Sequence, residues 1–309
     1  MTTTQTIQTG TGSGTENSNT AAALLTNARS FLFVPASQPD RFAKALATSA
    51  DAVIFDLEDA VAPAAKASAR QALADAFVHF SPAQRQRSLV RINASDSDEY
   101  TEDTALVAAL AVQGLAGVVV PKAQDPQDLA SLAKAVGDTC HLIPLIESVA
   151  GLDAANALAK APGVVRLAFG HLDFQLDAGM QAGADEAELT AIRVDMVLAA
   201  RRADIAAPID GVSVDIQDPG QLASDIARSQ RLGFTGKLCI HPKQVSDVNA
   251  AWTPSAEAVS WAQRVVAGAQ ATTQGAFSLD GRMVDAPVIA KAHKILALVA
   301  RQGDSAERS

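Results

Sequence analysis

The sequence predicts a (β/α)8 barrel, the TIM-barrel fold, followed by a C-terminal helical extension. Short apolar runs alternate with longer segments of helical spacing, polar side chains follow nearly every apolar run, and two more helical segments come after the last unit. Eight βα units over roughly 220 residues match the size of such a barrel. The main rival, an open doubly wound sheet, seldom needs eight similar strands.

Eight apolar runs are the expected strands. They are rich in Val, Ile, Leu and Phe with little alternation, which is typical of strands buried on both faces. The runs are residues 31–34, 52–55, 89–92, 118–120, 142–146, 164–169, 212–214 and 238–240. The segments between them carry helix signals, such as Asp125 and Asp218, each before a proline, and Gly233 just past a helix end.

The chain divides into three parts. Residues 1–28 are rich in Thr, Ser, Gly, Gln and Asn, and are expected to be a disordered N-terminal tail because they offer little apolar surface to bury. Residues 29–250 are the expected barrel. Residues 251–309 are the expected extension or lid, with helices over 256–269 and 287–301 that could cap the chain's own barrel or reach a neighbouring subunit.

Charge and composition exclude several classes of protein. The chain of 309 residues has 25 Lys and Arg against 34 Asp and Glu, a net charge of −9, which argues against nucleic-acid binding. No apolar run approaches the roughly 20 residues that would span a bilayer. Cys140 and Cys239 are too few for a disulfide framework, and indicate reduced thiols in a cytoplasmic protein.

Chemistry in this fold collects just after the C-terminal ends of the strands. Glu147 and Asp173 each follow an apolar strand, so both are expected at the same mouth. Two carboxylates with waters and a substrate oxygen can complete the octahedral oxygen shell that Mg²⁺ prefers, and no His or Cys cluster favours zinc. The alternative is that each carboxylate caps a helix or pairs with a loop.

Arg91 lies inside an apolar strand, where a guanidinium needs an anionic partner. It could clamp a carboxylate or a developing oxyanion, or form an internal salt bridge with Asp56, Glu58 or Glu147, and both can hold. Asp56, Glu58 and Asp59 crowd one strand exit and could surround the metal and hold its water, although a helix cap explains one of them equally well.

Other polar residues give weaker signals. Lys44, Lys66 and Arg70 on the first two predicted helices could hold a phosphorylated ligand or simply face solvent. His241 is expected to be a packed, hydrogen-bonded residue rather than a catalyst, and both cysteines are expected to be inert.

Several blocks in order resemble the citrate lyase β-subunit-like branch of the HpcH/HpaI aldolase superfamily. The resemblance covers residues 29 to about 298 and becomes specific only when the blocks are combined. They are RSFLFVP from Arg29, DLEDAV from Asp56, VRIN from Val90, PK from Pro121, LIES from Leu145, FG from Phe169 leading to Asp173, GF with GK from Gly233, IHP from Ile240 and DGRMVDAP from Asp280.

The resemblance implies a TIM barrel that forms homotrimers or hexamers and uses Mg²⁺ to cleave or form C–C bonds in acyl thioesters. Glu147 and Asp173 would be the metal ligands, with Glu147 also in the substrate site. Arg91 would contact substrate oxygens and stabilise the enolate, and Lys44 would help hold coenzyme A. Asp285 would transfer a proton, from the extension of a neighbouring subunit as in the malyl-CoA lyase relatives.

Together these implications predict a lyase that cleaves a 3-hydroxyacyl-CoA thioester, of the citramalyl-CoA or malyl-CoA type, to a 2-oxo acid and acetyl-CoA. Alternatives are a CoA-thioester hydrolase, a malate-synthase-like condensing enzyme, or a non-catalytic ligand-binding barrel. The chain departs from the family pattern at Ala36, Gln38 and the pair His171-Leu172. Coenzyme A is favoured over an acyl-carrier protein because no signature of such a partner is visible.

Overall fold

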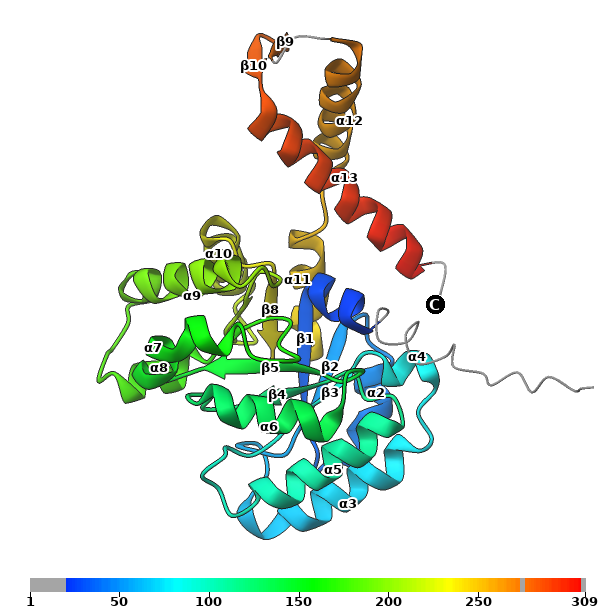
Figure 1. Ribbon diagram of the computed structural model, residues 1–309, viewed down its shortest axis with the longest axis vertical. Coiled ribbons are helices and arrows are strands. Elements are labelled where there is room, and N and C mark those ends of the chain that lie inside the picture. Colours follow the sequence, from blue (N-terminus) through cyan, green and yellow to red (C-terminus); the bar gives the residue numbers. More distant parts are fainter. Residues whose placement is uncertain (1–20, 273–275, 307–309) are drawn as a thin grey trace, which may run out of the picture. The chain divides into compact units, whose positions relative to one another are not determined.

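A computed structural model describes residues 21–272 and 276–306, and its main feature is a closed barrel of eight parallel strands (Figure 1). Neighbouring strands pair in sequence order, and β1 closes the ring by pairing with β8 at Phe31↔Leu238. This closure confirms the predicted barrel and rules out the open sheet. The strands are β1 Ser30–Pro35, β2 Ala52–Asp56, β3 Ser88–Arg91, β4 Gly117–Val120, β5 His141–Ile146, β6 Ala168–Phe169, β7 Ile209–Asp210 and β8 Gly236–Cys239.

Helices surround the barrel (Figure 1). Asp125 and Asp218 cap α6 and α10 as predicted, since their carboxylates accept hydrogen bonds from the first backbone N–H groups. Gly233 ends α10 with a left-handed φ of 99°. The helices are α2 Phe42–Leu46, α3 Lys66–Phe77, α4 Pro82–Arg85, α5 Tyr100–Val112, α6 Pro126–Val136, α7 Val149–Leu158, α8 His171–Asp177, α9 Thr190–Arg202, α10 Pro219–Leu232 and α11 Val245–Ala251, with 3₁₀ turns η1 Pro39–Arg41, η2 Pro63–Ala65, η3 Ala187–Leu189 and η4 Pro242–Gln244.

Strands β6 and β7 are shorter or earlier than expected. Within the expected strand 164–169, Val164 forms only an isolated bridge to Leu142, and ladder pairing is confined to Ala168 and Phe169. The seventh strand is Ile209–Asp210 rather than 212–214, and directly after it the Gly211 carbonyl accepts a 2.7 Å hydrogen bond from Lys237 Nζ. The apolar run 212–214 therefore follows the strand instead of forming it.

The structure corrects the expected disordered tail for residues 21–28, whereas residues 1–20 lie outside the described part. Residues 21–27 are helical, and Leu25 is fully buried in the same core cluster as Phe31, Ala52 and other strand residues. Arg166 Nη1 donates to the carbonyls of Leu25, at 3.2 Å, and Ala28, at 2.6 Å. Ala21 and Leu25, four residues apart on this helix, are both buried in the core cluster, and this burial orders the segment although the residues before it are mostly polar.

The chain forms two compact units, the first ending at Asn249 and the second beginning at Ala250, one residue before the expected boundary. The second unit has two packed helices, α12 Ala256–Ala271 and α13 Ala286–Ala306. An antiparallel pair, β9 Phe277–Leu279 and β10 Arg282–Val284, lies between them in the sequence. The helical extension is thus confirmed. Within the described ranges, no helix is both long and apolar enough to cross a membrane.

Candidate active site

A cavity of about 390 Å³ is lined by residues at the carboxyl ends of the barrel strands. Five residues predicted from the sequence line it, namely Asp56, Asp59, Arg91, Glu147 and Asp173. They come from the exits of strands β2, β3, β5 and β6, so the barrel assembles in space what the sequence separates. Apolar side chains complete the wall: Phe33, Leu145, Phe169, Leu172, Val212, Leu238 and Ile240.

Glu147 is buried and held by its neighbours. Its Oε1 accepts a 2.6 Å hydrogen bond from the backbone N–H of Lys122, which has the left-handed φ of 46°. Its other oxygen lies against Gly170, where an added Cβ would come within 2.6 Å of Oε2. A glycine at position 170 is therefore required for Glu147 to occupy this place.

Asp173 lies in the first turn of α8 and is half-buried. Burial, the charge of Glu58 and the charge of Asp173 all raise the pKa of Glu147, to about 8, and the Lys122 hydrogen bond and Arg91 oppose the rise only in part. The two carboxylates therefore share one cavity and repel each other there. Both carboxylates thus lie at the barrel mouth, as expected from the sequence, and their binding of one cation stays a prediction.

Arg91 is buried among carboxylates. Its Nε and Nη2 donate to the two oxygens of Asp56, each at 2.7 Å, and its Nη1 lies 2.9 Å from Glu58 Oε2. Its guanidinium also lies over the Phe33 ring, 4.8 Å from the centroid. The predicted internal salt bridge thus forms with Asp56 and Glu58, while Arg91 still lines the cavity. The internal salt bridge is therefore present, and the role of Arg91 as a clamp for a substrate oxyanion stays a prediction.

The loop after β2 is tightly fixed. Besides Arg91, Asp56 accepts hydrogen bonds from the backbone N–H groups of Glu58 at 3.0 Å and Ala60 at 3.2 Å. Lys66 Nζ donates to the carbonyls of Leu57 and Glu58 from the opposite side. Burial raises the pKa of Glu58 to about 7, and the attraction of Arg91 offsets this only partly. Because the buried Lys66 ammonium is hydrogen-bonded to the Leu57 and Glu58 carbonyls, Lys66 stabilises this loop rather than binding a ligand.

The donor set fits a hard divalent cation. The lining contributes the carboxylates of Asp56, Asp59, Glu147 and Asp173, with His171 as its one imidazole among the described residues. Burial lowers the pKa of His171, and the charge of Glu186 offsets this only in part. No group of three or more His, Cys, Asp or Glu is preassembled as a complete metal site within 21–272 and 276–306. Water or substrate oxygens would have to complete a shell around Glu147 and Asp173, as Mg²⁺ commonly requires.

Among the other predicted residues of the first unit, Lys44, Arg70 and His241 do not line the cavity. Lys44 is exposed on α2, and Asp285 belongs to the second unit, where its Oδ1 accepts a hydrogen bond from the Val288 N–H at the start of α13. Arg70 pairs with Glu99 and Asp103. His241 Nδ1 accepts from the Lys243 N–H and caps η4, in keeping with the expected structural role.

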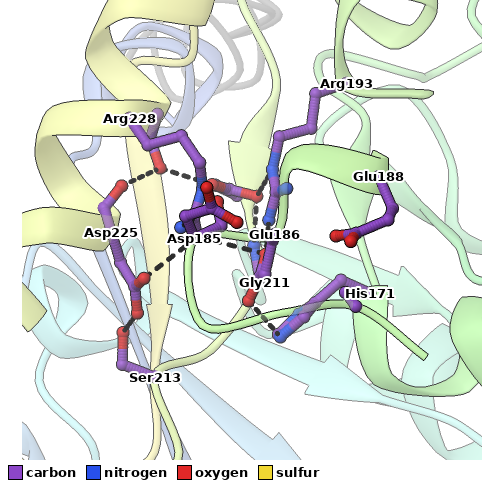
Figure 2. Close-up of polar contacts among 12 residues, drawn as sticks. His171, Asp185, Glu186, Glu188, Arg193, Gly211, Ser213, Asp225 and Arg228 are labelled. Carbon is purple, nitrogen blue, oxygen red and sulfur yellow. Dashed lines mark hydrogen bonds and ion pairs between the residues drawn. The ribbon is translucent and has the colours of Figure 1, made fainter. Parts of the chain in front are cut away.

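Sequence reasoning missed a second polar group beside the cavity. Six buried or nearly buried residues, which we call the β7 charge cluster, surround the exit of β7; they are Asp210 and Lys237, together with Glu186, Arg193, Asp225 and Arg228, which Figure 2 labels. The sequence signal for this cluster was a charged residue in each of two neighbouring barrel strands, Asp210 in β7 and Lys237 in β8. Their partners on helices and loops carried no recognisable spacing.

Comparison with known proteins identifies the class. The family model described as HpcH/HpaI aldolase/citrate lyase matches residues 29–242. A citrate lyase subunit beta-like protein of Mycobacterium tuberculosis is 36% identical over 271 residues, covering 86% of this chain and 93% of the relative. A (3S)-malyl-CoA thioesterase of Cereibacter sphaeroides is 31% identical over 272 residues, covering 87% and 93%.

A solved structure agrees with these relatives. The crystal structure of protein CitE from Mycobacterium tuberculosis in complex with magnesium, acetoacetate and coenzyme A matches with a TM-score of 0.76 and 34% identity, covering 89% of this chain and 99% of that one. The barrel and its polar mouth thus define a member of an aldolase and lyase superfamily. The chain belongs to the HpcH/HpaI aldolase/citrate lyase family, with citrate lyase β-subunit-like relatives, which confirms the predicted resemblance.

Proposed function

We propose that the protein is a Mg²⁺-dependent carbon–carbon lyase that cleaves a 3-hydroxyacyl-CoA thioester, of the citramalyl-CoA or malyl-CoA type, to a 2-oxo acid and acetyl-CoA. The observation that carries the proposal is the meeting of Glu147 and Asp173 with Arg91 at one cavity. The relative CitE was crystallised with magnesium, an oxo acid and coenzyme A, which supports the same ligand classes here.

Glu147 and Asp173 would hold the Mg²⁺, and Asp56, Glu58 and Asp59 would surround it. Bound there, a divalent cation would act as a Lewis acid that lowers the pKa of the substrate hydroxyl. Glu147 is already oriented by the Lys122 N–H and Gly170, so little reorganisation is needed. This pair therefore fixes the end of the substrate that becomes the 2-oxo acid.

Arg91 would stabilise the other product. When a base removes the hydroxyl proton and the C–C bond breaks, the electron pair of that bond moves onto the thioester fragment as an enolate, and the guanidinium of Arg91, held by Asp56, lines the same cavity. Asp285 would then deliver the proton to the enolate carbon, and in the reverse direction would remove a proton from acetyl-CoA. Apolar side chains such as Leu145 and Phe169 would exclude water from this step.

Lys44 would contact the coenzyme A moiety. It is exposed on α2, which follows β1 in the chain, and its ammonium is free to meet an anionic group. We further propose a homotrimer or hexamer in which Asp285 serves a neighbouring subunit.

A thioester hydrolase is the second candidate, favoured by the similarity to a malyl-CoA thioesterase. The two reactions differ in whether water attacks the thioester. The test supplies citramalyl-CoA or malyl-CoA with Mg²⁺ and follows 2-oxo acid and free coenzyme A separately. A 2-oxo acid with acetyl-CoA supports the lyase, whereas free coenzyme A without a 2-oxo acid supports the hydrolase. No turnover of any thioester would contradict both and favour a non-catalytic barrel.

A further inference from the structure

The start of α8, which carries Asp173, is fixed from one side by His171. This side chain is buried, and its ring lies so close to Gly211 that an added Cβ there would come within 2.1 Å of His171 Nδ1. The ring is also 6.1 Å from the Phe169 ring, centroid to centroid. Asp173 is two residues further along the same first turn of α8, so a shift of this turn at His171 would also shift the Asp173 carboxylate.

The Nδ1 side of the His171 ring lies near Gly211, and its Nε2 side faces Glu186. His171 Nε2 lies 3.5 Å from Glu186 Oε1, so the first residue of α8 meets the residue that precedes η3 (Figure 2). Glu186 adopts the left-handed backbone conformation, with φ 47° and ψ 38°, which is uncommon for a residue with a side chain. Such a conformation persists only where the surrounding contacts enforce it.

Two arginines supply those contacts. Glu186 Oε2 pairs with Arg193 Nη2, and with Arg228 Nη2 at 3.1 Å. Arg193 Nε reaches Asp210 in β7 at 3.0 Å, and Arg228 Nη2 reaches Asp225 in α10 at 3.0 Å. Figure 2 shows Asp225 between Arg228 and Ser213. The Glu186 carboxylate is thus tied to the barrel wall and to two helices.

The β7 charge cluster balances itself. It has three acidic members, Glu186, Asp210 and Asp225, and three basic members, Arg193, Arg228 and Lys237. His171 lies outside this balance, so its contact with Glu186 is not needed to neutralise the cluster. A role in placing His171, and with it α8, accounts for that contact.

We propose that Glu186 is a positioning residue for Asp173, acting through His171. This inference rests on the proposed metal site, since it concerns how one of its carboxylates is held. Partners that orient the ligands of a metal commonly contribute tenfold to a hundredfold in affinity.

The test is a calorimetric titration of the full-length protein with Mg²⁺ in the absence of substrate. Glu186→Gln keeps the shape of the side chain and should weaken Mg²⁺ binding about tenfold to a hundredfold. The matched control is Glu188→Gln in the same loop, whose carboxylate accepts a hydrogen bond from the Gly183 N–H instead, and it should leave the affinity unchanged. Asp225→Asn should lower the melting temperature but weaken Mg²⁺ binding less than Glu186→Gln does, because Asp225 reaches Glu186 only through Arg228 and does not contact His171.

A double-mutant cycle shows whether the effect passes through His171. If it does, Glu186→Gln should have no further effect on Mg²⁺ affinity in a His171→Ala background. Gly211→Ala is an independent variant, because the three atoms nearest its added Cβ all belong to the His171 ring. It too should weaken Mg²⁺ binding in the native protein but not in the His171→Ala background. It keeps the test valid if Glu186→Gln does not fold.

Two results would overturn the inference: a lower melting temperature of Glu186→Gln with unchanged Mg²⁺ affinity, or equal effects of Glu186→Gln with and without His171. If Glu186→Gln does not fold, unchanged affinity in Gly211→Ala has the same consequence. Failure of the proposed function looks different. In that case the native protein would bind no Mg²⁺, or Asp173→Asn would bind it as well as the native protein does.

Discussion

The backbone N–H of Lys122 is directed at Glu147 Oε1 over 2.6 Å, and Lys122 adopts a left-handed backbone conformation where it does so. On the other side, the Glu147 carboxylate packs against Gly170. The backbone N–H of Lys122 on one side, and the lack of a side chain at Gly170 on the other, thus define the position of the Glu147 carboxylate. The first prediction follows from this pairing.

Gly170→Ala should displace Glu147, because the added Cβ would lie 2.6 Å from Oε2 and 2.7 Å from the Glu147 Cβ. We expect turnover and Mg²⁺ affinity to fall at least about tenfold, with the fold retained. Steady-state kinetics and metal titration measure this. Gly183→Ala is the matched control, since its nearest neighbour would be 3.6 Å away and both properties should stay unchanged. Native activity in Gly170→Ala would show that Glu147 has room to move.

Asp173→Ala should abolish Mg²⁺-dependent turnover while the circular dichroism spectrum stays native. The side chain is half-buried in the first turn of α8 and is not one of the buried residues of the barrel, so its loss should leave the core intact. Full activity in this variant would refute the metal assignment.

The metal-free protein should lose stability as pH rises through about 8. The pKa of Glu147 is about 8 in the folded state, because burial and the charges of Glu58 and Asp173 outweigh the Lys122 hydrogen bond and Arg91. The ordinary carboxyl pKa of the unfolded chain is about 4.3, so between these values the folded state binds more protons than the unfolded state, and its stability falls with increasing pH.

Melting temperatures at pH 6 and pH 8.5 measure this effect. Mg²⁺ should reduce the difference, and its binding should release protons, which calorimetry in two buffers detects. Glu147→Gln lacks the titrating group and should show a smaller dependence on pH. An equal dependence in native and variant proteins would assign it to other groups.

Asp285→Ala should inactivate the protein, because the proposed proton donor is lost. If Asp285 serves a neighbouring subunit, mixing Asp285→Ala with Arg91→Ala should restore part of the activity, since some sites then receive both native residues. The mixed oligomers are prepared by co-expression and assayed for 2-oxo acid release. No recovery would place Asp285 within its own chain or outside the reaction.

Leu25→Ala should lower the free energy of unfolding by about 2–5 kcal/mol, as for other fully buried leucines. Denaturant titration measures the loss. Leu176→Ala is the control, because that side chain is 83% exposed and its removal should change stability little. A native stability of Leu25→Ala would mean that residues 21–28 contribute little to the core.

The sequence was sufficient for the barrel and for the site's carboxylates, for a physical reason. Strands buried on both faces are uniformly apolar, so a charge such as Arg91 inside one, or Glu147 directly after one, stands out and has a known direction in this fold. Local spacing therefore carries the information.

The missed features depend on contacts between distant segments. Leu25 is buried because strands much later in the chain cover it, and Glu186 meets His171 only after α8 and the following loop have folded. The run 212–214 has strand composition, yet the chain leaves the ladder at Gly211, where the His171 ring and the Lys237 ammonium meet it. Tertiary contacts overrode local preference at each of these places.

The surplus of carboxylates around Arg91 has a kinetic consequence. Asp56 and Glu58 already compensate the guanidinium, so a 2-oxo acid arriving alone meets the negative charge of Asp173 rather than a vacant positive charge. A divalent cation bound in the cavity would make the electrostatic potential there positive. We therefore expect ordered addition, with the metal ahead of the organic anion.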